Sequence, residues 1–371
     1  MTRRSSRLHS RSENALIQKG KITKQSSRKK AQPLSKRPNE KLVLEGVASP
    51  CILIETPEKA CDEPSYVNLA PRNDRIQPSP LPLLSWGSPE DVWEKMVIKD
   101  QRYIHSKNFI QQNPRIEPRM RSILLDWLLE VSEVYTLHRQ TFYLAQDYFD
   151  RFMLTQDNIN KERLQLIGIT CLFIASKMEE IYPPKLAEMA FVTDGACLEH
   201  QILQMELIVL KALNWNLCPE TAVSWLKLYI QMSSISDNSQ LLEPQFPQEI
   251  YIRVTQLLDL CVLSVNSLNF QYRVLAAAVL CHFIQFEMVE KVSGLSWDVI
   301  EPCVDWMAPF VETLAHFGSV ALKDLVKVKP EDRHNIQTHS DYMAMLDEVR
   351  HREVESQFLT PPNSTEKTSA H

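Results

Sequence analysis

Between residue 86 and about residue 325, apolar residues recur every three or four positions, and this spacing constrains the fold more than any other feature. It places apolar side chains along one face of an α-helix. Pro118, Pro219 and Pro247 stand near helix starts, where a missing backbone N–H costs nothing. We therefore predict an all-α fold. The expected helices cover residues 89–106, 117–136, 139–155, 160–181, 185–192, 198–213, 219–232, 247–264, 270–288 and 298–316.

Two of these segments resemble each other. Gly168 to Glu180 and Val274 to Met288 both run from small residues into large apolar residues and then acids. A central helix with closely packed neighbours has this composition. We therefore predict a tandem repeat of one five-helix unit. The periodicity by itself leaves the function open.

Several kinds of site have no support in the sequence. The 7 glycines form neither G-x-G-x-x-G nor G-x-x-x-x-G-K-[ST], so no cradle for nucleotide phosphates is expected. The 8 cysteines never fall as C-x-x-C and the 10 histidines include no H-E-x-x-H, so we expect no metal and no cofactor. No catalytic triad spacing is recognisable, which argues against an enzyme. No apolar run reaches the roughly 18 residues of a membrane span, and no signal peptide is recognisable.

The charge is unevenly distributed. Residues 1–41 carry 13 Lys and Arg against 2 Glu, whereas the whole chain has a net charge of −5. Residues 1–85 lack sustained periodicity and are expected to be disordered. Arg3-Arg4 and Arg28 to Lys30 fit a nuclear-import signal, although a merely solvated tail is an equal alternative. Because the predicted folded part is acidic, we expect no direct nucleic-acid binding.

The segment Met120 to Val131 carries two apolar stripes. Met120, Ile123, Leu124 and Trp127 form one, and Leu125, Leu128, Leu129 and Ser132 form the other. A helix at the surface of one domain needs only one core face. Composition favours a central, fully buried helix over one whose extra stripe meets a partner, without excluding the latter.

The same segment, MRSILLDWLLEV, is similar to the opening of the cyclin box. The resemblance continues in order through residues 138–153, 164–186, 191–197 and 205–215, and it covers about residues 86–325. The flanking stretches at 79–93, 334–339 and 359–364 resemble the E-type subfamily, and within it a second vertebrate paralogue. The resemblance implies an N-terminal cyclin box at 86–218, a C-terminal box at 219–325 and disordered tails at 1–85 and 326–371.

The resemblance also implies a function. Members of this family bind a cyclin-dependent kinase and move its C-helix, which completes the phosphoryl-transfer site without supplying a reacting group. Lys177 and Glu206 match a pair that grips backbone groups of the kinase, although an ordinary salt bridge is the simpler interpretation of such a pair. The apolar contact positions implied by the match are Met178, Leu210, Trp215 and Leu217, and the alternative for these is core packing.

A second set of residues matches a groove for substrates and inhibitors that carry Arg-x-Leu. An apolar groove can hold the leucine, and a carboxylate can hold the arginine. The matched residues are Met120, Ile123, Leu124, Trp127, Glu130 and Gln165.

The tails carry Ser-Pro and Thr-Pro dipeptides, which are weak signals individually. Thr360 with Ser364 resembles the E-type phosphodegron read by the F-box subunit of a ubiquitin ligase, and Thr56 resembles its weaker second copy. Ser224 to Tyr229 falls where E-type cyclins carry a centrosome-targeting segment, but an amphipathic helix explains it equally well. The expected location is the nucleus, with the centrosome as a further possibility.

Overall fold

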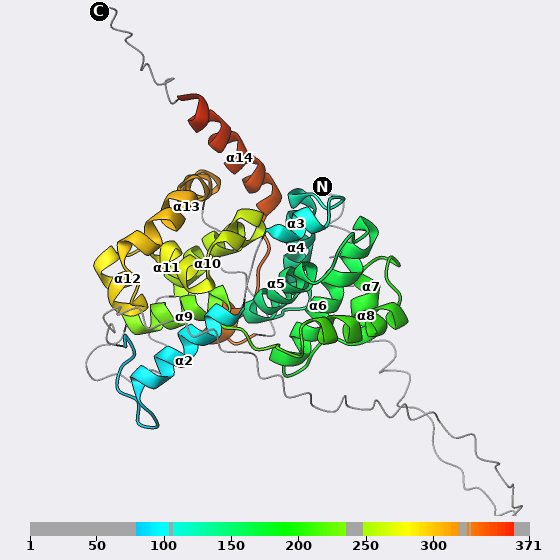
Figure 1. The fold of residues 1–371 in the computed structure, drawn as a ribbon, viewed down its shortest axis with the longest axis horizontal. Helices are drawn as coiled ribbons and strands as arrows, with labels where there is room; N and C mark the ends of the chain where they lie inside the picture. Colours follow the sequence, from blue (N-terminus) through cyan, green and yellow to red (C-terminus); the bar gives the residue numbers. More distant parts are fainter. Residues whose placement is uncertain (1–78, 104–106, 235–247, 319–324, 326–327, 360–371) are drawn as a thin grey trace, which may run out of the picture. The chain divides into compact units, whose positions relative to one another are not determined.

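The computed structural model describes residues 79–103, 107–234, 248–318, 325 and 328–359, with the side chains of 354–359 excluded. The described residues contain helices and no strand, apart from one isolated bridge between His138 and Ile336. The all-α prediction is confirmed. Figure 1 shows two sets of helices, α4 to α8 and α9 to α13, side by side.

The first set contains five helices. They are α4 (Pro118–Val134), α5 (Arg139–Leu154), α6 (Leu164–Glu179), α7 (Leu186–Val192) and α8 (Glu199–Ala212). Helix α6 contacts the other four, and its residues from Ile167 to Ser176 are all buried. At Gly168 a Cβ atom would lie 2.8 Å from Leu124 Cδ1, so the glycine lets α4 approach α6 closely.

The second set repeats this arrangement. Its helices are α9 (Ala222–Ser233), α10 (Gln248–Leu263), α11 (Tyr272–Cys281), α12 (Phe286–Ser293) and α13 (Trp297–Phe317). Helix α11 contacts the other four, as α6 does in the first set. Both central helices lie where the internal resemblance placed them, and the predicted two-unit fold is confirmed.

The predicted helix 270–288 is wrong in its length. The chain leaves the helix after Cys281, and α12 begins at Phe286 after Gln285 adopts an extended conformation. The break turns Val289 and Val292 into the core. Apolar residues continue through the break, and for this reason periodicity did not reveal it.

Helices outside the two sets complete the fold. They are α2 (Pro89–Arg102), α3 (Asn108–Gln112), the short 3-10 helices η1 (Lys161–Arg163), η2 (Val265–Asn269) and η3 (Pro330–Asn335), and α14 (Tyr342–Leu359). Helix α2 packs on α9, where Trp93 and Trp225 meet edge to face and the Trp225 indole donates to Asp100. Helix α14 lies in the stretch assigned to the C-terminal tail and was not foreseen. It contacts α4, α10 and α13, and it buries Tyr342, Leu346 and Val349.

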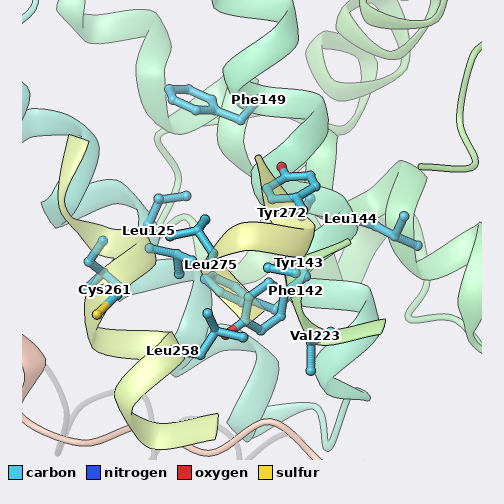
Figure 2. Packing of buried hydrophobic residues seen from close by; sticks show 14 of the residues in the cluster. Leu125, Phe142, Tyr143, Leu144, Phe149, Val223, Leu258, Cys261, Tyr272 and Leu275 are labelled. Atoms are coloured by element: carbon cyan, nitrogen blue, oxygen red, sulfur yellow. The ribbon is translucent and has the colours of Figure 1, made fainter. Parts of the chain in front are cut away.

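The hydrophobic core is continuous between the two sets. Figure 2 shows Leu125, Phe142 and Tyr143 from the first set close to Leu258, Cys261 and Leu275 from the second. Arg121 of α4 forms a buried two-point ion pair with Asp150, at 2.7 and 2.8 Å, and donates to the Val262 carbonyl of α10. The two helical units are therefore joined by apolar packing and by buried polar contacts.

Candidate functional site

Lys177 and Glu206 form an ion pair on adjacent helices. Lys177 lies in the last turn of α6, and Glu206 lies in the middle of α8. The lysine side chain is 40% exposed and the glutamate side chain 12%. The ammonium also lies 4.3 Å from the centre of the Phe173 ring, one turn earlier on α6. Partial burial lowers the pKa of Lys177. The pair thus lies at the surface, and Lys177 is the more accessible of the two charges.

The apolar residues predicted beside this pair differ in exposure. Trp215 is 63% exposed and Met178 is 46% exposed, so both present surface to a partner. Leu217 is half-buried against the core, and Leu210 is buried. The structure therefore favours core packing for Leu210, the alternative that the sequence left open.

Trp215 has an unusual backbone conformation. It follows the end of α8 with φ of 58°, directly after Asn214 with φ of 50°. Asparagine tolerates this left-handed region, whereas a bulky tryptophan rarely adopts it. The Trp215 N–H bonds the Leu210 carbonyl at 3.0 Å and so fixes the turn. An exposed aromatic held in a strained conformation is typical of a functional position.

Sequence reasoning missed further exposed apolar residues on, or directly after, the two helices that carry the pair. They are Ile181 and Tyr182 after α6, and Leu203, Leu207 and Ile208 on α8. The residues on α8 share a helix with Ile202, Met205 and Val209, which face the core. Apolar residues on both faces of α8 were the available signal. The name α6–α8 face is used here for the exposed apolar residues Met178, Ile181, Tyr182, Leu203, Leu207 and Trp215. Ile208 is not included, because at about 100° per residue it lies roughly 160° from Glu206 around α8.

The two stripes of α4 have different environments. Leu125, Leu128, Leu129 and Ser132 are buried, so this stripe belongs to the core. On the other stripe, Leu124 is buried against Gly168, while Met120 and Trp127 are half-buried and Ile123 is 38% exposed. Glu130 on α4 and Gln165 on α6 are half-buried. The helix is therefore not fully buried, and Met120, Ile123 and Trp127, here called the α4 face, remain accessible.

The C-terminal segment crosses the same helix. His339 Nε2 lies 2.9 Å from Asp126 Oδ1, and its backbone N–H donates to Glu133. Arg119 forms an ion pair with Asp347 of α14. Sequence reasoning missed these contacts because nothing local links residues about two hundred positions apart.

Other predicted residues lie outside the described part of the chain. These are the basic clusters and the degron residues Thr56, Thr360 and Ser364. Within the residues that the structure describes, no group of three His, Cys, Asp or Glu side chains could hold a metal ion, and no helix is long and apolar enough to cross a membrane.

In the Ser224 to Tyr229 segment, Trp225, Leu226 and Tyr229 are buried. The structure thus accounts for this segment as an amphipathic helix.

Two copies of a five-helix unit, each built around a central helix, define an all-α tandem-repeat protein. The family descriptions "Cyclin, N-terminal domain" and "Cyclin, C-terminal domain" match residues 91–218 and 221–342. The chain therefore belongs to the cyclin family. Cyclins are regulatory subunits and not enzymes.

The curated relatives show that the chain is of the E type. The chain is 49% identical to G1/S-specific cyclin-E1 of Gallus gallus over 337 residues, which cover 86% of this chain and 82% of the relative. It is 47% identical to the Danio rerio protein of the same name, with 87% and 83% covered. The Mus musculus protein is 52% identical, with 81% and 75% covered.

Proposed function

We propose that this chain binds and activates a cyclin-dependent serine/threonine kinase through the α6–α8 face and thereby promotes entry into DNA replication. Membership of the cyclin family supports the kinase partner. The relatives named G1/S-specific cyclin-E support the stage of the cell cycle.

The observation that carries this proposal is the position of Lys177 and Glu206 within the exposed apolar surface. An ammonium and a carboxylate that are close together supply donors and an acceptor for backbone groups of a partner. Exposed Trp215 and Met178 can exclude water around them, and an aromatic beside a polar pair is typical of an interface hot spot. In the free chain the two charges satisfy each other. On binding, each turns partly toward the partner while the pair stays close.

The mechanism follows from differential affinity. The chain supplies no reacting group to phosphoryl transfer. It binds more tightly to the kinase whose C-helix is in the active position, where the glutamate of that helix meets the lysine that holds the ATP phosphates. A partner that binds one conformation better shifts the population toward it.

The direct experiment mixes the full-length chain with a purified inactive cyclin-dependent kinase and measures histone phosphorylation. We expect a rise of orders of magnitude, and no phosphorylation by the chain alone. Lys177→Glu should weaken kinase binding strongly, by about 2 to 5 kcal/mol, as is typical when one partner is lost from a charge pair that becomes buried in an interface. Lys161→Glu is the matched control, because Lys161 lies in η1, directly before α6, and the length of α6 separates it from Lys177 by roughly 20 Å at 1.5 Å per residue. Equal kinase activity with and without the chain would refute the proposal.

We also propose that the α4 face, with Glu130 and Gln165, docks substrates and inhibitors that carry Arg-x-Leu. Accessible Ile123 and Trp127 support it, since a leucine side chain needs an apolar groove. Trp127→Ala should leave kinase assembly intact and slow phosphorylation of Arg-x-Leu substrates. Trp86→Ala, at an exposed tryptophan outside the α4 face, should change neither. Loss of folding in Trp127→Ala would instead assign Trp127 to the core.

Further proposals rest on the sequence and on its relatives. Phosphorylation of Thr360 and Ser364, and more weakly Thr56, directs degradation by an F-box ubiquitin ligase. The basic clusters direct the chain to the nucleus, and Ser224 to Tyr229 is the candidate for a centrosome signal. As a test of the degron, mutating Thr360 to Ala should lengthen the half-life of the chain in dividing cells.

The relatives also support a subfamily assignment. The chain is about equally identical to the fish, bird and mouse cyclin-E1 proteins, which supports a vertebrate paralogue distinct from cyclin-E1.

A further inference from the structure

The acidic side of α4 is partly occupied by the chain's own C-terminal segment. Asp126, Glu130 and Glu133 are spaced so that all three carboxylates fall on one side of the helix. His339 reaches this side from the segment between η3 and α14. Its imidazole lies 2.9 Å from Asp126, and its backbone N–H donates to Glu133.

This acidic side adjoins the α4 face. At about 100° per residue, Ile123, Glu130 and Asp126 fall within roughly 60° of the helix circumference. Both side chains of the His339–Asp126 pair are about one-fifth exposed, so the contact lies at the surface. A peptide whose apolar residue contacts Ile123 or Trp127 would therefore bring a neighbouring basic residue to the carboxylates that His339 approaches.

The surroundings of His339 favour its charged form. Burial lowers the pKa of the imidazole, but the hydrogen bond to Asp126 and the nearby Glu130 and Glu133 carboxylates raise it, and the net direction is upward. From α14, Tyr342 meets the imidazole edge to face, and its hydroxyl donates to Asp259. A protonated His339 therefore neutralises part of the acidic side over a wider pH range than a free histidine would.

We propose that His339 is a specificity-determining residue that competes with the basic residue of a docked peptide for Asp126. This inference rests on the proposed docking of Arg-x-Leu peptides at the α4 face. Arginine can replace the imidazolium because its planar guanidinium makes two parallel hydrogen bonds to a carboxylate. A peptide that lacks a basic residue gains nothing from displacing His339.

The competition gives a pH dependence of definite sign. As the pH rises through the pKa of His339, the imidazole loses its charge and its hold on Asp126 weakens. Arginine does not titrate in this range. Affinity for a basic peptide should therefore rise with pH in the natural chain.

The test uses the full-length chain bound to its kinase and a fluorescent Arg-x-Leu peptide free of histidine, titrated between pH 5.5 and 8. His339→Ala should bind the peptide about threefold to tenfold more tightly at the low end of this range, which corresponds to one charge-assisted contact. Its affinity should also vary little with pH. In an Asp126→Asn background the same His339→Ala change should not alter peptide affinity, because the amide that replaces the carboxylate carries no charge to compete for.

Two controls separate this proposal from simpler outcomes. Thr338, the residue before His339, accepts a hydrogen bond from Arg139. Thr338→Val removes this bond and so loosens the same segment without altering the acidic side. It should leave peptide affinity unchanged. If His339→Ala weakens binding or does not change it, the competition does not exist.

If the peptide binds the natural chain and Trp127→Ala equally, or binds neither, the docking function itself fails, and this inference fails with it. If the natural chain binds the peptide and Trp127→Ala does not, the docking function stands. The effect of His339→Ala with and without Asp126→Asn then decides the role of His339.

Discussion

Arg139 of α5 and Asp259 of α10 form an ion pair at 2.9 Å, in which both side chains are buried at the junction of the two helical units. The same carboxylate also accepts from Tyr143 of α5, and from Gln337 and Tyr342 of the C-terminal segment. Burial raises the pKa of Asp259, and these donors and Arg139 lower it, with a net upward direction. Both helical units and the C-terminal segment therefore meet at one side chain.

Replacing Arg139 with Met should destabilise the chain strongly. It leaves a buried carboxylate without its cation, a change that typically lowers the free energy of unfolding by about 3 to 5 kcal/mol. Chemical denaturation followed by circular dichroism measures this loss. Glu220→Gln is the control, because its pair with Lys99 is partly exposed and should contribute no more than about 1 kcal/mol. Similar losses in both variants would show that Asp259 does not hold the junction.

Gly168→Ala should destabilise the first helical unit. The added methyl group would lie 2.8 Å from Leu124 Cδ1, so α4 and α6 must separate or Leu124 must leave its position. Overpacking of this kind costs about 1 to 3 kcal/mol. Gly87→Ala is a matched substitution, since its new Cβ would meet only Val92 at 3.9 Å. A melting temperature for Gly168→Ala equal to that of Gly87→Ala would contradict the close approach of the two helices.

Trp215→Gly should separate function from stability. Glycine adopts positive φ freely, which relieves roughly 1 to 2 kcal/mol of backbone strain in the folded chain. Its greater freedom in the unfolded chain lowers stability by about 0.5 to 1 kcal/mol and offsets part of this gain. The melting temperature should therefore change little. Kinase binding should weaken by about 2 kcal/mol or more if Trp215 is a hot spot, as isothermal titration can show.

Asn214→Gly changes the neighbouring left-handed residue and should leave kinase affinity unaltered. If Trp215→Gly binds the kinase normally, the strained tryptophan has no part in the interface.

The regular features of the fold were accessible from sequence, and the contacts between distant residues were not. Central helices α6 and α11 were predicted because a buried helix needs apolar residues on all sides, and such a pattern is local. The pairs Arg121–Asp150 and Arg139–Asp259 join residues that only tertiary packing brings together. Helix α14 has no clear amphipathic pattern, and its Tyr342 and Leu346 find burial only against other helices.

The candidate site shows the same division. Matching motifs selected Lys177 and Glu206, and the structure brings them into contact. Sequence could not distinguish buried Leu210 from exposed Leu207, because both are apolar residues on one helix with two apolar faces.

The contact between His138 and Glu180 should make the stability of the first helical unit depend on pH. His138, at the start of α5, lies 2.7 Å from Glu180, directly after α6, and Thr141 also donates to this carboxylate. The hydrogen bond to Glu180 raises the pKa of His138 above its usual 6.5. Burial raises the pKa of Glu180, but its bonds to His138 and Thr141 outweigh burial and hold it below its usual 4.5.

The two shifts define a window. A histidine with a raised pKa contributes stability that is full below about pH 6.5 and is lost as pH rises through its folded-state pKa. A glutamate with a lowered pKa contributes stability that is full above about pH 4.5 and is lost as pH falls through its folded-state pKa. The contact should therefore stabilise the chain most between about pH 4.5 and 6.5.

Melting temperatures of the natural chain and of His138→Gln, measured from pH 4 to 9, test this window. The natural chain should exceed the variant most near pH 5.5, and the difference should shrink toward pH 9 because a neutral imidazole and a glutamine make similar hydrogen bonds. His200→Gln is the control, since His200 is an exposed histidine on α8. A difference between the natural chain and His138→Gln that stays constant with pH would mean that the contact with Glu180 does not depend on the charge of the imidazole.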